Sequence, residues 1–178
     1  PVGICGSGIL DAVAAMADGG LVDSRGALQN DHPLISPGTN GTRTFVLAPA
    51  DRAGHGHSIL ITRKDVAEIQ LAKSAIRTGI ELLIEKAGIS AADIEEFIVA
   101  GAFGTYISTA SALRIGMFPA IAPERIKQVG NAAGMGAWQL LISKERRQQA
   151  AQVVRDIHYL ELTTHPGFQD AFATYMAL

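Results

Sequence analysis

The sequence predicts a mixed α/β fold in a single domain that spans residues 1–178, and three observations carry this prediction. Residues 62–88 combine a capping pattern with apolar residues at helical spacing. The short apolar run at 97–100 is typical of a buried strand. Glycine-rich segments stand where a strand or loop meets a helix, as expected where the two kinds of element alternate.

Composition and charge limit the possible functions. The chain has 178 residues, 48% hydrophobic and 18% charged, which suits a packed core and argues against disorder. Its 15 Lys+Arg and 17 Asp+Glu give a net charge of -2, so we expect neither nucleic acid nor a membrane as a partner. Cys5 is the only cysteine, which favours a reducing, cytoplasmic location.

The first residues indicate how the chain is organised. It starts at Pro1, without an initiator Met, and runs at once into a glycine-dense segment at 3–8. We therefore expect it to be a domain cut from a longer protein. The uncharged stretch at 97–113 is interrupted by glycine and hydroxyl residues, so we interpret it as buried core and not as a membrane span.

The first third of the chain predicts a helix and two strands. Apolar residues at helical spacing predict a helix over 7–18, which the glycine pair 19–20 ends. Residues 23–41 are rich in Asn, Asp, Pro, Gly and Ser, which is typical of a loop or irregular hairpin. Residues 44–48 and 58–61 predict strands joined by a polar link.

The clearest predicted element is the long helix that follows. Thr62 and Asp65 form a capping-box pattern, and Gly88 ends the helix. We expect its buried stripe to consist of Ile69, Ala72, Ile76, Ile80, Leu83 and Ala87. We expect a solvated stripe to consist of Lys73, Arg77, Glu81 and Glu85.

The second half of the chain alternates strands and helices. A capped turn at Ser90 and Asp93 leads into the strand at 97–100. The later patterns predict a helix at 105–114, a strand at 127–130, helices at 131–142 and 143–156, a strand at 159–163, and a final helix that opens at Pro166. The helix at 131–142 is rich in small residues, which allows close approach to another backbone or a ligand.

Three glycine-rich segments, 3–8, 101–104 and 130–136, are the candidate binding elements. Each places backbone amides and a helix end where phosphate or sugar oxygens bind. None matches an established phosphate motif. The first reads G-x-x-G-x-G without a preceding strand, and the sequence contains no G-x-x-x-x-G-K-[ST]. Taken singly, each segment is better explained by a tight turn or a close helix contact, whereas the three together favour ligand binding.

Other polar residues predict less. His55 and His57 form an H-x-H pair, but no third ligand has suitable spacing, so we favour a polar loop and predict no metal site. We expect Cys5 to be a small buried residue. No nucleophile and base are paired in the sequence, so we assign no catalytic residue.

Five segments in order along the chain carry a family resemblance. They are GICGSGILD at 3–11, DVAEIQLAKSAIRTGIELL at 65–83, FIVAGAFGTYI at 97–107, IGMFP at 115–119 and GNAAGMGA at 130–137. Together they resemble the C-terminal domain of ATP-dependent reductive activators of corrinoid proteins. That resemblance implies an actin-like, ribonuclease H-like lobe, a mixed sheet flanked by helices, of the acetate and sugar kinase, heat-shock and actin (ASKHA) superfamily.

The resemblance also implies how the complete protein is built. Family members carry an N-terminal [2Fe-2S] ferredoxin domain, a linker and two actin-like lobes, and they use ATP to help reduce the cobalt of a corrinoid protein that serves in methyl transfer. This chain would be the second lobe, with its own first lobe, the ferredoxin domain and the corrinoid protein as partners, and a homodimer as a further possibility. The ATP and Mg²⁺ would bind in the complete protein, and the cluster would lie outside this chain. Alone, the lobe is expected to be inactive.

The family's binding residues map onto the glycine segments. The resemblance assigns the adenosine side of the cleft to Gly101, Ala102, Phe103 and Gly104. It places Gly130, Asn131 and Gly134 on the connecting helix that packs at the lobe interface. It places Gly6, Ser7 and Gly8 near the cleft entrance.

Two alternatives stay open at this point. One is a lobe of a sugar- or acid-kinase-like phosphotransferase, for which the sequence offers no identifiable carboxylate base. The other is a non-enzymatic dimerisation module, in which the glycines serve packing alone.

Overall fold

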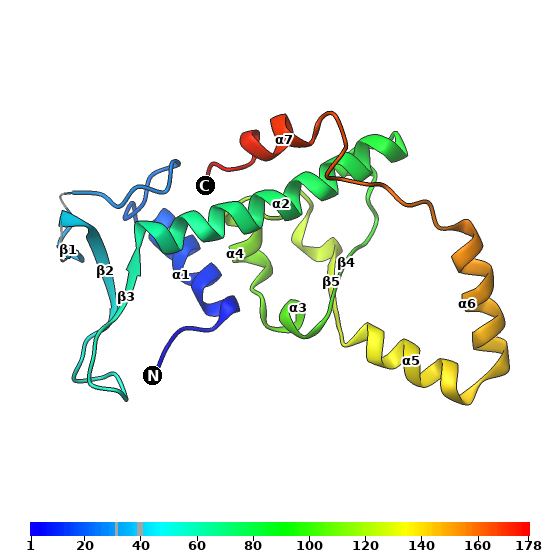
Figure 1. The fold of residues 1–178 in the computed structure, drawn as a ribbon, viewed down its shortest axis with the longest axis horizontal. Coiled ribbons are helices and arrows are strands. Elements are labelled where there is room, and N and C mark those ends of the chain that lie inside the picture. The colour runs from blue at the N-terminus through cyan, green and yellow to red at the C-terminus, as the bar shows by residue number, and fades with distance from the viewer. Residues whose placement is uncertain (31, 39–40) are drawn as a thin grey trace.

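One long helix runs across the molecule, and the other elements are arranged along it (Figure 1). The computed structural model describes residues 1–30, 32–38 and 41–178, without the side chains of Ala102 and Phe103. The helices described are α1 (Gly6–Asp18), α2 (Arg63–Ala87), α3 (Ala102–Tyr106), α4 (Thr109–Arg114), α5 (Ala132–Ile142), α6 (Lys144–Asp156) and α7 (Phe168–Thr174). The strands described are β1 (Ile35–Pro37), β2 (Arg43–Ala48), β3 (Ile59–Thr62), β4 (Phe97–Ala100) and β5 (Ile126–Gly130).

The elements divide between the two sides of α2. The sheet β1–β2–β3 lies at the N-terminal end of α2, α7 lies on one side of it, and α1, α3 and α4 lie on the other (Figure 1). Helices α5 and α6 extend away from the remaining elements (Figure 1). Strands mixed with helices in this way agree with the predicted α/β class.

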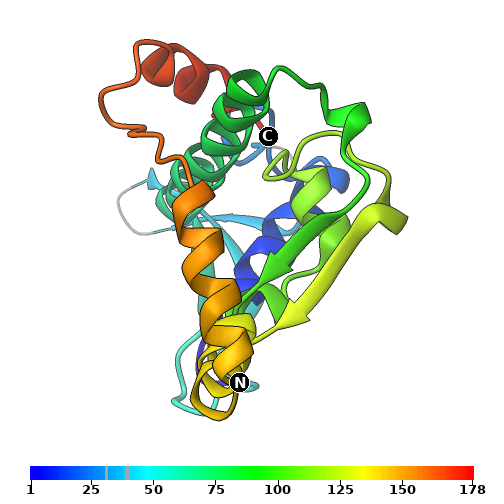
Figure 2. The same cartoon turned by 90° about the vertical axis from the view of Figure 1, so that its right-hand side faces the viewer.

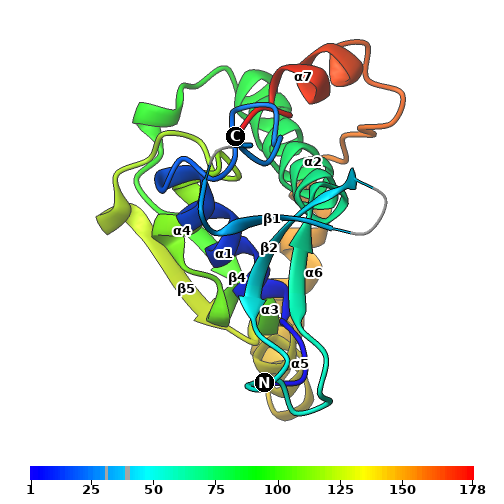
Figure 3. The ribbon, with the colours of Figure 1, turned by 90° about the vertical axis from the view of Figure 1, so that its left-hand side faces the viewer.

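The first sheet is antiparallel, with Phe45 of β2 opposite Ile35 of β1 and Ile61 of β3. Figure 3 shows it crossing in front of α2. Strands β2 and β3 were predicted to within a residue at their ends, whereas β1 falls in the segment predicted to be a loop or irregular hairpin. Three residues are too few to show an alternating pattern, so β1 is defined by its pairing with β2.

Helix α2 begins and ends at the predicted residues. The Thr62 hydroxyl accepts from the Asp65 N–H, the Asp65 carboxylate accepts from the Thr62 N–H at 2.8 Å, and Gly88 ends the helix with a φ of 65°. These contacts satisfy backbone groups that have no partner within the helix. The capping prediction is therefore confirmed.

The buried face of α2 differs from the prediction. Of the expected stripe, Ile76 is 42% exposed and Leu83 is 55% exposed. The residues buried instead are Val66, Gln70, Lys73, Ser74, Thr78, Gly79 and Leu82. The prediction is confirmed for Ile69 and Ile80, which pack against the core, and for the exposed Glu85. It was wrong for Lys73, because backbone carbonyls of the C-terminal segment lie against α2 and accept hydrogen bonds from its polar side chains.

Strands β4 and β5 form a parallel pair, in which Val99 is opposite Gln128. Both strands were predicted. Figure 2 shows the two arrows side by side, pointing the same way toward α5. The inner face of β4 packs on the core, where the ring centroids of Phe97 and Phe118 lie 4.9 Å apart.

The core lies between α1, α4, the end of β3 and the first turns of α2. Its fully buried side chains include Val13 and Met16 of α1, Val66 of α2, and Ile115 after α4. This core fixes α1 and α4 against each other, and it thereby positions the glycine segments that follow β4 and precede α1.

Two further predictions need correction. The helix expected at 105–114 is two helices, because the chain breaks at Ile107 and the Ser108 hydroxyl caps α4 by accepting from the Ser111 N–H at 3.2 Å. The strand expected at 159–163 is not formed. There Glu161 accepts hydrogen bonds from the Tyr159 hydroxyl and the Thr163 N–H, which form a local turn in place of a ladder.

Helices α5, α6 and α7 lie close to their predicted ranges. Asn131 caps α5, Ser143 caps α6, and α7 begins two residues after Pro166. No helix in the described part of the chain combines the length and the apolar character needed to cross a bilayer.

Candidate nucleotide-binding site

Two glycine turns meet at the carboxyl ends of β4 and β5. Gly101 follows β4 with a φ of 97°, and Gly130 ends β5 with a φ of 64°, a backbone region that favours glycine. The Gly101 N–H donates to the Gly130 carbonyl at 2.7 Å, which joins the two turns. Ligands of open parallel sheets bind at this edge, where the strands end.

Helix α3 packs closely on β4 through Gly104. A Cβ atom on Gly104 would lie 2.7 Å from Cγ1 of Val99, too close for any other residue unless the helix or the Val99 side chain shifts. The Thr105 hydroxyl donates to the Gly101 carbonyl at 3.1 Å and fixes the start of α3. The backbone of Ala102 and Phe103 opens this helix, and their side chains lie outside what the structure describes.

Gln128 of β5 holds the end of the same segment. Its Nε2 donates to the carbonyls of Gly104, at 2.6 Å, and Ile107, at 2.7 Å. Gln128 was not identified from the sequence. It stands beside Lys127 in β5, so the local pattern does not distinguish it from an ordinary solvent-facing polar residue.

The start of α5 follows the second glycine turn. The Asn131 side-chain oxygen accepts from the Gly134 N–H at 2.9 Å, the usual N-cap contact. A Cβ on Gly134 would lie 2.5 Å from the Asn131 side-chain nitrogen, so glycine here lets the cap form. Gly130, Asn131 and Gly134 are thus a single local unit beside Gly101.

The third glycine segment forms the first turn of α1. Gly6, Ser7 and Gly8 begin this helix, which contacts α3 and so approaches the first glycine turn (Figure 1). Cys5 caps the helix, because its sulfur accepts from the Gly8 N–H at 3.4 Å. The packing of α1 against α3 brings all three predicted segments to one side of the molecule.

Cys5 is exposed, so the expectation of a buried residue was wrong. Hydrogen bonds with the Ser7 hydroxyl and the Gly8 N–H lower the pKa of the Cys5 thiol.

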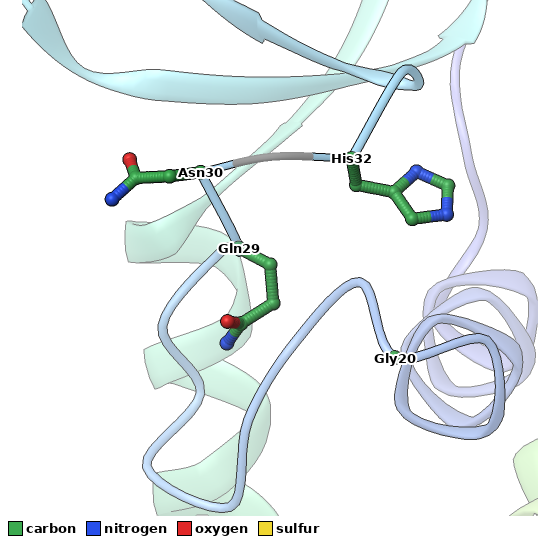
Figure 4. Close-up of a pocket in the computed structure, with 4 residues that line it drawn as sticks. All are labelled: Gly20, Gln29, Asn30 and His32. Atoms are coloured by element: carbon green, nitrogen blue, oxygen red, sulfur yellow. The ribbon is translucent and has the colours of Figure 1, made fainter.

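The other candidate polar sites lack converging groups. A hollow of about 330 Å³ is lined by Gly20, Gln29, Asn30 and His32, and Figure 4 shows Asn30 and His32 pointing in opposite directions. His55 and His57 lie in the exposed link between β2 and β3. Among the described residues, no three His, Cys, Asp or Glu side chains form a possible metal site.

Comparison with known proteins identifies the family. The family described as the C-terminal domain of RACo, the ASKHA domain, matches residues 1–178. The chain is 40% identical over 180 residues to corrinoid activation enzyme RamQ of Eubacterium limosum, covering 97% of this chain and 30% of the relative. It is 30% identical over 173 residues to a [Co(II) methylated amine-specific corrinoid protein] reductase of Methanosarcina barkeri, covering 96% of this chain and 28% of that protein.

A solved structure is also similar. It is a reductive activator for a corrinoid, iron-sulfur protein, with a TM-score of 0.88 and 32% identity over 100% of this chain and 28% of that one. The chain therefore spans less than a third of the length of each of these relatives. This likeness agrees with the actin-like α/β fold that the sequence predicted. The chain belongs to the family of RACo C-terminal ASKHA domains.

Proposed function

We propose that this chain is the nucleotide-binding lobe of a longer, ATP-dependent reductive activator, which reduces the cobalt of a corrinoid protein. The observation that carries the proposal is the joined pair of glycine turns at the carboxyl ends of β4 and β5. The names of the relatives support the second half of the proposal, since they describe corrinoid activation and the reduction of a Co(II) corrinoid protein.

The glycine turns suit a nucleoside. A Cβ on Gly101 would meet nothing within 4 Å, so the turn after β4 offers backbone that a flat base and its ribose can approach closely, while the buried Gly104 lets α3 pack on β4 behind it. In our proposal Gly101–Gly104 contact the adenosine, and Gly130, Asn131 and Gly134 line the adjoining wall. Gly6, Ser7 and Gly8 stand at the entrance, next to α3.

The cofactors divide between this chain and the rest of the protein. ATP with Mg²⁺ fits a cleft of which this lobe supplies one side, and the phosphate and metal contacts belong to the preceding lobe. A [2Fe-2S] cluster needs four thiolates, and Cys5 is the only cysteine here, so we assign the cluster to a ferredoxin domain elsewhere in the protein. When bound there, the cluster supplies electrons one at a time.

The exposed apolar surface of α5 and α6 supports a partner within the same protein. Leu141 of α5 is 80% exposed, and Trp138 of α5 and Val154 of α6 are also largely exposed. A concentration of exposed apolar side chains on neighbouring helices is typical of an interface between proteins or domains. We propose that the preceding lobe covers it, and a homodimer is the competing arrangement.

The test is an absorbance assay of the full-length protein with a corrinoid protein in its Co(II) form and a low-potential electron donor. We expect Co(I) to accumulate when ATP is added and to accumulate much less without it. A reduction that does not depend on ATP would contradict the proposal. ATP consumption that requires a small hydroxyl or carboxyl substrate would indicate a phosphotransferase instead.

A further inference from the structure

We propose that Gln128 is a positioning residue for the nucleotide-binding turn. Its amide fixes the end of α3 to β5, so that one strand sets the position of both glycine turns. This inference rests on the proposed function, and it concerns a residue that contacts the backbone of the turn and not the nucleotide.

Helix α3 cannot hold itself in place. It has five residues, and a helix this short has carbonyls at its C-terminal end without partners inside the helix. The carbonyl of Gly104 is one of these groups, and the carbonyl of Ile107 comes directly after the helix; the single Nε2 of Gln128 donates to both. The two hydrogens of the amide nitrogen are thereby used.

The other end of the turn is attached to the same strand. The Gly101 N–H donates to the carbonyl of Gly130, two residues beyond Gln128 on β5. Between these attachments, Gly104 lies against Val99 and leaves no room for α3 to move toward β4. The segment 101–107 is therefore held at both ends by β5 and from one side by β4.

The role of Gln128 is to position the turn and not to fill the core. Gln128 is exposed, so removing its amide leaves no large cavity. The charged neighbours Lys127 and Glu96 form an ion pair with each other. Loss of the Gln128 amide should therefore loosen the turn while the fold persists.

The substitution Gln128→Glu separates these roles. It keeps the size of the side chain but turns a carboxylate toward two carbonyls, and carboxylate and carbonyl are both acceptors. Protonation of the introduced carboxyl at lower pH restores one donor. The matched control is Gln169→Glu, the same change at an exposed position on α7.

The experiment measures ATP affinity by calorimetry in the full-length protein. At about pH 7.5 we expect Gln128→Glu to bind ATP about tenfold more weakly than wild type, and the ratio to shrink at about pH 5.5. Comparing the ratio at each pH cancels the titration of ATP itself. We expect Gln169→Glu to match wild type at both values.

Amide hydrogen exchange without nucleotide provides the second readout. We expect faster exchange over residues 102–107 in Gln128→Glu, with unchanged exchange in α2. Wild-type affinity and exchange in this variant would overturn the positioning role. If wild type itself does not bind ATP, the proposed function fails, and the inference fails with it because there is no nucleotide to position. Faster exchange in the variant would then show only that Gln128 holds the turn.

Discussion

Lys73 is a lysine buried where α2 meets the C-terminal residues. It is 2% exposed, and its ammonium donates to the carbonyl of Ala177. Removal from water, with the nearby charge of Arg77, lowers the pKa of Lys73 from 10.5 to about 8. Burial disfavours the charged form of a base, which accounts for the direction of the shift.

This shift predicts how stability changes with pH. Between about pH 8 and 10.5 the unfolded chain holds a proton on Lys73 that the folded protein has released, so the free energy of unfolding rises with pH through this window. Lys73→Met should lack that contribution. Urea unfolding of both proteins at a series of pH values tests it, and parallel profiles would contradict the buried-lysine account.

The roles of two residues, Lys73 and Gln128, were not predicted from the sequence. Lys73 was assigned to a solvated stripe and Gln128 was not identified, although both are central to the contacts described above. Each donates to backbone carbonyls of a segment far along the chain, and such contacts leave no local pattern. Asp65 was identified correctly because its partner, Thr62, lies three residues away.

At the scale of elements, α7 is attached to α2 mainly by side chains that donate to its backbone and to the residues after it. Gln70 donates to the Met176 carbonyl at 2.9 Å, Ser74 donates to the Phe172 carbonyl, and the guanidinium of Arg77 lies 4.9 Å from the centre of the Tyr175 ring. The donors Gln70 and Ser74 are buried, so losing either one leaves a partly buried carbonyl in or just after α7 without this partner.

Ser74→Ala should therefore loosen α7. We expect faster amide exchange over residues 168–178 and a stability loss of about 1–3 kcal/mol, the usual result of leaving a buried acceptor unpaired. The control is Thr174→Ala, which removes an exposed hydroxyl that donates to Asp170 within α7 itself. Equal exchange in the two variants would show that α7 does not depend on Ser74.

Elements with local signals were predicted well. The N-caps at Thr62 and Ser143 and the glycine stop at Gly88 marked helix ends, because those contacts join residues close in sequence. Strand β1 was not predicted, since it is defined by its pairing with β2. The break between α3 and α4 was missed although its cap is local, since the Ser108 hydroxyl accepts from the N–H of Ser111 three residues further on.

At the scale of the whole molecule, α5 and α6 leave a large apolar surface uncovered. Trp138, Leu141 and Ile142 of α5 are each more than half exposed, as are Val153 and Val154 of α6. Leaving this much apolar surface in water is unfavourable by about 25 cal/mol for each square ångström. A protein surface of this kind is expected to be covered.

The isolated 178-residue chain should therefore self-associate. We expect Leu141→Glu combined with Val154→Lys to reduce this association and to lower the binding of a hydrophobic dye. Sedimentation of the chain with and without the two substitutions measures the effect. A wild-type chain that is monomeric and does not bind the dye would contradict the proposed interface.

The α/β class was predictable from the strand and helix patterns along the chain. The family was predictable because five segments resemble the family's segments in the same order. The meeting of those segments was not derivable from spacing alone. It depends on the parallel pairing of β4 with β5 and on the packing of α1 against α3. These are contacts between elements, which a pattern of residues does not specify.

The central claim is that the turn at Gly101–Gly104 binds the nucleotide. Gly104→Val would place its Cβ 2.7 Å from Val99 Cγ1, so that α3 or the Val99 side chain must shift, whereas a Cβ at the control position Gly167, before α7, would lie 3.6 Å from its nearest neighbour, the His165 ring. Calorimetric titration of ATP into the full-length protein is the most direct measurement. We predict binding by wild type and Gly167→Val, and affinity lower by on the order of tenfold or more in folded Gly104→Val. Equal affinity in all three proteins would contradict the account.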